Sequence, residues 1–312
     1  MKEFKLTDLE GIGPKKAEAL EGYGIKTPLD FIIRGAKEIS RLTGLTTPAS
    51  LKHIHNLQKK LAESGEPIKI NSIETLRELR KTVTKIPTNC KELDLMTRGG
   101  FETQAVYEIY GPEAVGKTQL TFTLTAEALR KKQGVWFIDC EGTFDEQRLE
   151  EICNKRLVTY NPEFIQYDLI TDSEELRHII NSDALEKIKT HDINLIIIDG
   201  LVGLFRFLYH GRGELYERQD IIEEILIKLK NLSIYLNVCV ILTNQVQSNP
   251  DPWGEKEKPV GGHVFGHSVK YIYALKKGMK NNRIARVIKS NKDPMADFVF
   301  YLTAQGVAND EK

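Results

Sequence analysis

One short segment, residues 111–118, constrains the fold of this 312-residue chain more than any other. It matches the pattern G-x-x-x-x-G-K-[ST], in which backbone N–H groups cradle phosphates, the lysine reaches the outer phosphates and the hydroxyl holds Mg²⁺. An apolar run precedes it and an amphipathic segment follows, so the sequence predicts a strand over 104–110 and a helix over 119–131. The predicted nucleotide-binding positions here are Gly111, Pro112, Glu113, Ala114, Val115, Gly116, Lys117, Thr118 and Gln119.

Composition excludes several other classes of protein. No apolar run approaches the length of a membrane span. The four cysteines (Cys90, Cys140, Cys153 and Cys239) form no C-x-x-C pair, which predicts reduced thiols, a cytoplasmic protein and no zinc site. Net charge is zero, although residues 1–60 contain 11 Lys and Arg against 7 Asp and Glu. Charge alone therefore gives little evidence for nucleic-acid binding.

Alternating strand and helix patterns fill the chain from residue 87 to residue 312. Strands are expected over 135–139, 164–169, 194–199 and 238–243, and helices over 146–153, 173–188 and 215–236. Such apolar strands with intervening helices predict an α/β fold whose mostly parallel sheet is covered on both faces. Further strands over 271–275, 283–288 and 298–302 are expected to extend this sheet as antiparallel hairpins.

The first 60 residues predict a small all-α domain of short helices broken by Gly and Pro. Its Gly11, Gly13 and Lys15 lie in a tight turn between two helices, a pattern typical of a helix–hairpin–helix that holds the DNA backbone. The alternative is a helix-ending turn in a protein-interaction bundle. Residues 61–86 read as a linker with one helix over 73–81.

Three polar residues are predicted at the carboxyl ends of strands, where ligands of open α/β sheets bind. Asp199 would orient Mg²⁺ with Thr118, and Glu141 would position and deprotonate an attacking water. Gln245 would contact the γ-phosphate or that water. Together, Glu141, Gln245 and Lys117 form the predicted catalytic set of an ATPase.

Further motifs make the whole chain resemble the archaeal RadA recombinases of the RecA-like strand-exchange superfamily. They are the helix–hairpin–helix, the run 99–104, the phosphate loop, the run 138–144 around Glu141, residues 201–219, and the two segments 243–246 and 259–263. The resemblance implies a RecA-like P-loop ATPase core over 87–312, after a DNA-binding domain over 1–60 and a polymerisation linker over 61–86.

The resemblance also implies roles for particular residues. ATP would bind between subunits of a helical filament or ring, with Arg148 on the adenine and Pro294 of the next subunit covering it. Gln245 and His267 would couple the γ-phosphate to the second DNA-binding loop. Single- and double-stranded DNA would contact Arg206, Arg212, Arg218, Gly261 and Gly262.

Departures from the family pattern occur at four places. Val115 is larger than the usual interior residue of the phosphate loop, and Gly200 replaces a serine after Asp199. Ile70 and Ile73 stand where the linker usually offers Phe and Ala as a polymerisation anchor. Lys289, with Lys292 nearby, replaces an acidic residue that holds a monovalent cation beside ATP. Either the Lys289 ammonium substitutes for that cation, or Lys289 is a surface lysine on an edge strand.

The sequence therefore predicts an ATP-dependent recombinase that forms filaments on single-stranded DNA and promotes homologous pairing and strand exchange, with ATP and Mg²⁺ as cofactors. One alternative is a paralogue that loads or regulates the recombinase, favoured by the altered anchor. Another is a DNA-binding switch that binds ATP but barely hydrolyses it.

Overall fold

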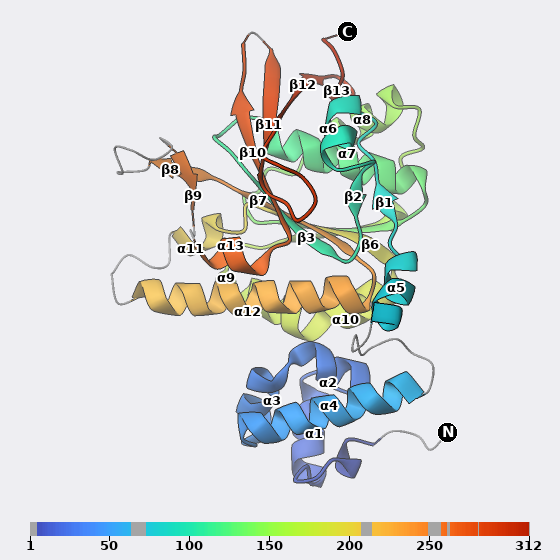
Figure 1. Cartoon of the computed structure of the whole chain (residues 1–312), viewed down its shortest axis with the longest axis vertical. Coiled ribbons are helices and arrows are strands. Elements are labelled where there is room, and N and C mark those ends of the chain that lie inside the picture. The colour runs from blue at the N-terminus through green and yellow to red at the C-terminus, as the bar shows by residue number, and fades with distance from the viewer. Residues whose placement is uncertain are drawn as a thin grey trace. The chain divides into compact units, whose positions relative to one another are not determined.

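A computed structural model describes residues 5–63, 73–206, 214–248, 257–260, 263–279 and 281–311 (Figure 1). The chain divides into two compact units, which are Met1–Val83 with His178–Leu185, and Thr84–Arg177 with Glu186–Lys312. The functional boundaries 1–60, 61–86 and 87–312 remain predictions.

Short helices make up the amino-terminal part of the chain, as the Gly and Pro punctuation predicts. They are η1 (Leu6–Asp8), α1 (Pro14–Gly22), α2 (Pro28–Arg34), α3 (Ala36–Thr43), α4 (Thr47–Glu63) and α5 (Ile73–Lys81). A capping box starts α2, because Asp30 N donates to Thr27 Oγ1 (3.2 Å) and Thr27 N donates to Asp30 Oδ2 (2.6 Å). Fully buried Leu20, Phe31 and Ile39 hold these short helices together.

A nine-stranded sheet forms the centre of the second unit, in the order β13-β12-β11-β10-β3-β7-β6-β4-β5. Strands β10, β3, β7, β6, β4 and β5 are parallel, and β10 to β13 are antiparallel neighbours. The bounds are β3 (Ala105–Tyr110), β4 (Gly134–Asp139), β5 (Ile165–Leu169), β6 (Ile193–Asp199), β7 (Cys239–Asn244), β10 (Tyr271–Lys277), β11 (Asn282–Lys289), β12 (Asp297–Thr303) and β13 (Gly306–Ala308). The predicted mostly parallel sheet with a carboxyl-terminal antiparallel extension is confirmed.

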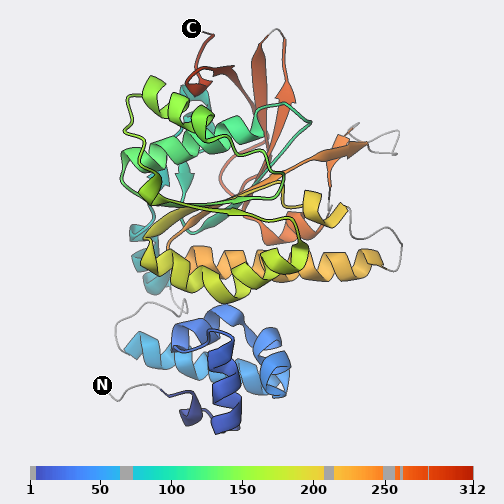
Figure 2. The same ribbon diagram turned by 180° about the vertical axis from the view of Figure 1, so that it is seen from behind.

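Helices cover both faces of this sheet. Helix α7 (Lys117–Arg130), with α8 (Glu146–Lys155) beside it, packs on one face, and α12 (Glu214–Tyr235) with α13 (His263–Ser268) packs on the other (Figures 1 and 2). Strands β3, β4 and β7 are buried along their whole length, which explains their continuous apolar sequences. In register, β7 neighbours both β3 and β6, so their carboxyl ends meet at one edge.

Some elements differ from the sequence prediction. The single helix expected over 173–188 is α9 (Ser173–His178), a π-helical segment (Ile179–Asp183) and α10 (Ala184–Thr190). Periodicity cannot distinguish one wider turn within a helix. The sequence also missed α6 (Lys91–Met96), α11 (Gly203–Arg206), η2 (Pro162–Phe164), β13 and two short pairs, β1 (Lys85–Ile86) with β2 (Phe101–Glu102) and β8 (Val246–Ser248) with β9 (Glu257–Pro259). Within the described residues, no helix combines the length and apolarity that crossing a bilayer requires.

Candidate nucleotide-binding site

The phosphate-binding motif forms the turn between β3 and α7, as predicted. Gly116 precedes α7 with φ 107°, and a Cβ there would lie 2.7 Å from the Leu302 side chain, so this position requires glycine. Glu113 and Ala114 are exposed, whereas the Val115 side chain is fully buried. The extra bulk of Val115 is therefore accommodated in the core, away from the exposed surface of the loop.

Lys117 lies folded over this loop. Its Nζ donates to the carbonyl oxygens of Gly111 (3.0 Å) and Pro112 (3.1 Å). Burial lowers the pKa of Lys117 from its usual value, while the nearby carboxylates, led by Glu141 and Asp199, act in the opposite direction. An anionic ligand in the loop would offer this ammonium stronger acceptors than two carbonyls.

Asp199 and Thr118 lie side by side where β6 ends and α7 begins. Thr118 Oγ1 donates to Asp199 Oδ2 at 2.8 Å, and Thr243 Oγ1 donates to Asp199 Oδ1. Burial raises the pKa of Asp199, the two hydroxyls lower it, and the charges of Glu141 and Asp139 raise it further. A buried carboxylate beside a hydroxyl fits Mg²⁺, which takes one or two protein ligands and completes its shell with phosphate and water. No cluster of three or more His, Cys, Asp or Glu suited to a metal occurs among the described residues.

The loop that carries Glu141 is held by Asp139, a residue to which the sequence motifs assigned no role. Asp139 Oδ1 accepts from the backbone N–H groups of Glu141 (3.1 Å) and Gly142 (2.8 Å), and Oδ2 accepts from that of Phe144 (2.9 Å). Tyr167 O–H also donates to Oδ2 (3.3 Å). An Asp at a strand end before a glycine-containing turn is the available sequence signal for such a turn.

Gln245 meets Glu141 at this edge of the sheet. Gln245 Nε2 donates to Glu141 Oε1 at 2.9 Å. The backbone of Gln245 is also fixed, because its N–H donates to Asn244 Oδ1 (2.8 Å) and its carbonyl accepts from Val260 N (3.0 Å). Asn244 Nδ2 donates to Val260 O (2.7 Å), so one amide side chain joins the two ends of segment 245–260. The structure thus brings the predicted catalytic residues Lys117, Glu141 and Gln245 to one region.

Arg148 lies beside Gln119 and the β12–β13 turn. Its guanidinium donates to Gln119 Oε1 (3.0 and 2.9 Å), Thr303 O (2.7 Å) and Ala304 O (2.9 Å). These bonds fix the plane of the guanidinium, and a guanidinium held in this way is suited to stack on a flat ring. Gln119 comes from the first turn of α7, and this links the predicted adenine-binding residue to the phosphate loop.

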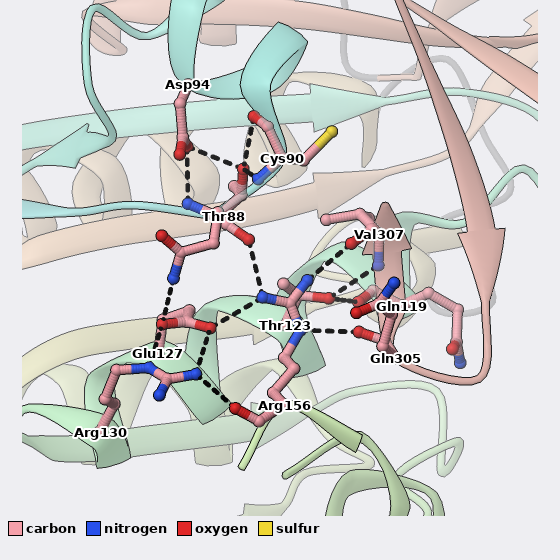
Figure 3. A network of polar contacts seen from close by, with 11 residues as sticks. Thr88, Cys90, Asp94, Gln119, Thr123, Glu127, Arg130, Arg156, Gln305 and Val307 are labelled. Atoms are coloured by element: carbon pink, nitrogen blue, oxygen red, sulfur yellow. Dashed lines mark hydrogen bonds and ion pairs between the residues drawn. The ribbon is translucent and has the colours of Figure 1, made fainter. Parts of the chain in front are cut away.

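Figure 3 shows Arg156, which supports the same turn. Arg156 donates to Glu127 Oε1 (2.7 Å), to Thr88 O (2.8 Å), and to the β12–β13 carbonyls of Gln305 (2.7 Å) and Val307 (2.6 Å). Only 6% of the Arg156 side chain and 1% of the Glu127 side chain are exposed. Arginine here holds the carboxyl-terminal strands against α7 and α8.

Lys289 is the last residue of β11, and Pro294 lies between β11 and β12. Lys289 is half-buried, and its Nζ donates to Gly266 O (2.7 Å) and Val269 O (2.6 Å) at the end of α13. Burial, with a contribution from Lys230, lowers the pKa of Lys289. Lys292 pairs with Glu102 (2.7 Å), and Pro294 is exposed. The His267 backbone belongs to α13, while its side chain lies outside what the structure describes.

Three of the eight predicted DNA-binding residues lie outside the described part, and for two more only the backbone is described. Arg212, Gly261 and Gly262 belong to undescribed segments, and only the backbones of Arg206 (end of α11) and Arg218 (in α12) are described. In the amino-terminal turn, Gly13 precedes α1, Gly11 has φ 79° and Lys15 is exposed. Ile12 between the two glycines is buried, so the turn is anchored while its backbone edge stays accessible.

Comparison with known proteins agrees with this geometry. A family model described as Rad51 matches residues 79–310. The DNA repair and recombination protein RadA of Cenarchaeum symbiosum (strain A) is 33% identical over 323 residues, covering 100% of this chain and 81% of that protein. These two matches confirm the predicted resemblance. The phosphate loop and the carboxylates at the strand ends lie within the residues that the family model matches. The chain belongs to the Rad51 family.

Proposed function

We propose that this chain is an ATP-dependent DNA recombinase, which coats single-stranded DNA and promotes homologous pairing and strand exchange. Membership of the Rad51 family supports this proposal, as does similarity to a protein named for DNA repair and recombination. The observation that carries it is the convergence of Lys117, Asp199, Glu141 and Gln245, from four elements, around the phosphate loop. This arrangement suits phosphoryl transfer, where catalysis is mainly positioning and charge stabilisation.

In the proposed reaction each residue has one task. Lys117 exchanges its carbonyl partners for β- and γ-phosphate oxygens of ATP. Asp199 and Thr118 would hold Mg²⁺, which neutralises charge on the same phosphates. Glu141 orients the attacking water and accepts its proton. Gln245 contacts the γ-phosphate and transmits its presence to segment 245–260.

Nucleotide binding is proposed to depend on assembly. Arg148 stacks on the adenine from the subunit that holds the phosphates, and Pro294 of the neighbouring subunit covers the other face. His267 and Lys289 of that neighbour approach the γ-phosphate. The exposure of Pro294 and the fixed guanidinium of Arg148 suit these roles.

Binding to DNA is assigned to two regions. Residues 1–60 would hold the backbone of double-stranded DNA through Gly11, Gly13 and Lys15, and Arg206, Arg212, Arg218, Gly261 and Gly262 would contact single-stranded DNA in the filament. Residues 61–86 would carry the polymerisation segment. Ile70 lies outside the described residues, whereas Ile73 begins α5 and is 59% exposed, so it offers an apolar anchor. We propose a cytoplasmic location, which the four free cysteines support.

The mediator alternative is less favoured, because a non-catalysing paralogue has no need of a complete set of hydrolytic residues. Negative-stain microscopy with single-stranded DNA and a non-hydrolysable ATP analogue separates the two. Regular helical filaments support a recombinase, and discrete small particles support a mediator.

Hydrolysis is tested with Glu141→Gln, which keeps the shape of the side chain and removes the base. DNA-stimulated hydrolysis should fall at least about 100-fold, with ATP retained and filaments stabilised. Glu150→Gln, at an exposed position in α8, is the control for loss of one negative charge. Unchanged DNA binding and turnover in Glu141→Gln would instead indicate a structural switch that barely uses hydrolysis.

A further inference from the structure

The Glu141 side chain lies directly over Gly200, which has no side chain. A Cβ placed on Gly200 would lie 2.2 Å from Glu141 Cγ, 2.7 Å from Cδ and 2.8 Å from Oε1. No pair of non-bonded carbon atoms tolerates 2.2 Å, so any side chain at position 200 excludes this placement of Glu141. In the same placement Glu141 Oε1 accepts the bond from Gln245 Nε2. We call this hydrogen bond, with Glu141 lying over Gly200, the resting contact.

The turn beneath Glu141 is held by hydrogen bonds on both sides of Gly200. Gly200 N donates to Thr243 Oγ1 (2.8 Å), which in turn donates to the buried Asp199 carboxylate. Gly200 O accepts from Gly203 N (2.8 Å). Because Gly200 is bonded on both sides, a new Cβ would displace Glu141, whose side chain is exposed and free to change rotamer.

The backbone of Glu141 is fixed as well. Asp139 accepts three N–H bonds from its loop, and Cys140 N donates to Asp199 O at 2.9 Å. Glu141 therefore moves by rotating its side chain, without moving its loop. The Glu141 carboxylate would then have two positions. In one it lies over Gly200, and in the other it points toward a water beside the phosphates.

Gln245 is the partner that connects this change to ligand binding. Its amide Nε2, which has two N–H groups, donates to Glu141 in the resting contact and would turn toward a γ-phosphate oxygen in the nucleotide complex. Phosphate is the stronger acceptor because it carries more charge. Its charge also repels the Glu141 carboxylate. Binding of ATP would therefore break the resting contact, because the γ-phosphate attracts the Gln245 amide and repels the Glu141 carboxylate.

We infer that Gly200 is a positioning residue that permits the resting contact, which holds Glu141 away from catalysis until Gln245 turns to the γ-phosphate. The inference rests on the proposed roles of Glu141 and Gln245 and adds a residue that acts through them. Its consequence is that release of Glu141 and the turning of Gln245, whose carbonyl accepts from Val260 N, begin together. The same contact lowers the rate of hydrolysis where ATP is below saturation, because ATP must first break it.

Gly200→Ala tests this, since its methyl group occupies the space in which Glu141 makes the resting contact. DNA-independent hydrolysis at sub-saturating ATP should rise about two- to tenfold, the range over which one hydrogen bond shifts an equilibrium. Binding of a non-hydrolysable ATP analogue should tighten by a similar factor, while kcat at saturating DNA changes less than about twofold. The control is Gly203→Ala in the same turn, whose Cβ would lie an unstrained 3.9 Å from Glu141 Oε1.

Gly200 has φ 86°, so alanine strains the turn and the variant needs an independent check. Crystal structures of the wild-type protein provide it. Gln245 Nε2 should contact Glu141 Oε1 without nucleotide and should leave it when the Mg²⁺ complex of the analogue is bound. The inference is wrong if the contact persists with nucleotide, or if a folded Gly200→Ala protein has the basal rate and analogue affinity of Gly203→Ala. A wild-type protein without DNA-dependent hydrolysis would instead contradict the proposed function.

Discussion

Asn244 donates a 2.8 Å hydrogen bond to Glu108, a carboxylate with no exposed surface in the middle of the sheet. Only one carboxylate oxygen of Glu108 is satisfied, because Oε2 has no partner among the described residues. Asn244 in turn joins the two ends of segment 245–260. An ionisable group therefore lies directly behind the amide that organises the proposed second DNA-binding loop.

Replacing Glu108 by glutamine should change how stability depends on pH. Burial raises the pKa of Glu108 to about 7, with the Asn244 bond opposing it. The folded state thus binds the proton more tightly, and the contribution of Glu108 to stability is complete below about pH 4.5 and lost as pH rises through about 7. The difference corresponds to on the order of 3 kcal/mol. Glu108→Gln never ionises, and it should be more stable than wild type at about pH 8 and similar at about pH 5.

Urea denaturation at several pH values measures this, because the difference between variant and wild type cancels all other titrating groups. Glu150→Gln, at an exposed site, should leave the pH profile unchanged. Equal pH slopes for wild type and Glu108→Gln would show that the carboxylate ionises inside the fold without cost.

Glu108 also illustrates what the sequence could not predict. The run from Ala105 to Tyr110 identified a strand correctly, since a strand buried on both faces reads as nearly continuous apolar residues. Nothing local distinguishes a glutamate in that run from one at a solvated edge. Its environment depends on β7 and β10, which are more than a hundred residues away in the chain and pair with β3 on either side.

The same limit applies to the site. Lys117, Thr118 and Asp199 were predicted because a motif and strand ends specify them locally. The pairing of Gln245 with Glu141 was not predicted, and Gly200 was interpreted only as a missing hydroxyl. Both depend on the order β7-β6-β4, which places the ends of these three strands side by side. Strand order is a long-range property, so such contacts follow only once the sheet is assembled.

Arg156 should be the most sensitive charged residue of the core. Lysine cannot reproduce bonds in four directions, and removing part of a buried pair leaves Glu127 without full compensation. We expect Arg156→Lys to lose on the order of 3 kcal/mol of unfolding free energy. Arg130 also pairs with Glu127, but 41% of its side chain is exposed. We therefore expect Arg130→Lys to lose less than about 1 kcal/mol of unfolding free energy. Similar losses in the two variants would contradict the central role of Arg156.

Arg148 should affect nucleotide affinity more than stability. Stacking on a base contributes about 1–3 kcal/mol, so Arg148→Ala should weaken binding of an ATP analogue about tenfold or more. Gln119→Leu removes two bonds to the guanidinium and should weaken it by a smaller factor in the same direction. Calorimetric titration measures both, with Arg177→Ala in α9 as a control for loss of a partly buried arginine. If only Gln119→Leu weakens binding, Arg148 does not contact the base.

Lys289 makes the dependence on monovalent cations testable. Its ammonium donates to the carbonyls of Gly266, in α13, and of Val269, just after it, where the partial negative charge of a helix end favours a cation. If it substitutes for a bound ion, DNA-stimulated hydrolysis by the wild type should differ less than about twofold between potassium and sodium buffers. Lys289→Asp should create a preference for potassium, because it restores an anionic ligand at that position. Lys276→Asp, also on the antiparallel part of the sheet, is the control for charge reversal. Strong potassium dependence of the wild-type protein would mean that an ion is still required and that Lys289 only caps α13.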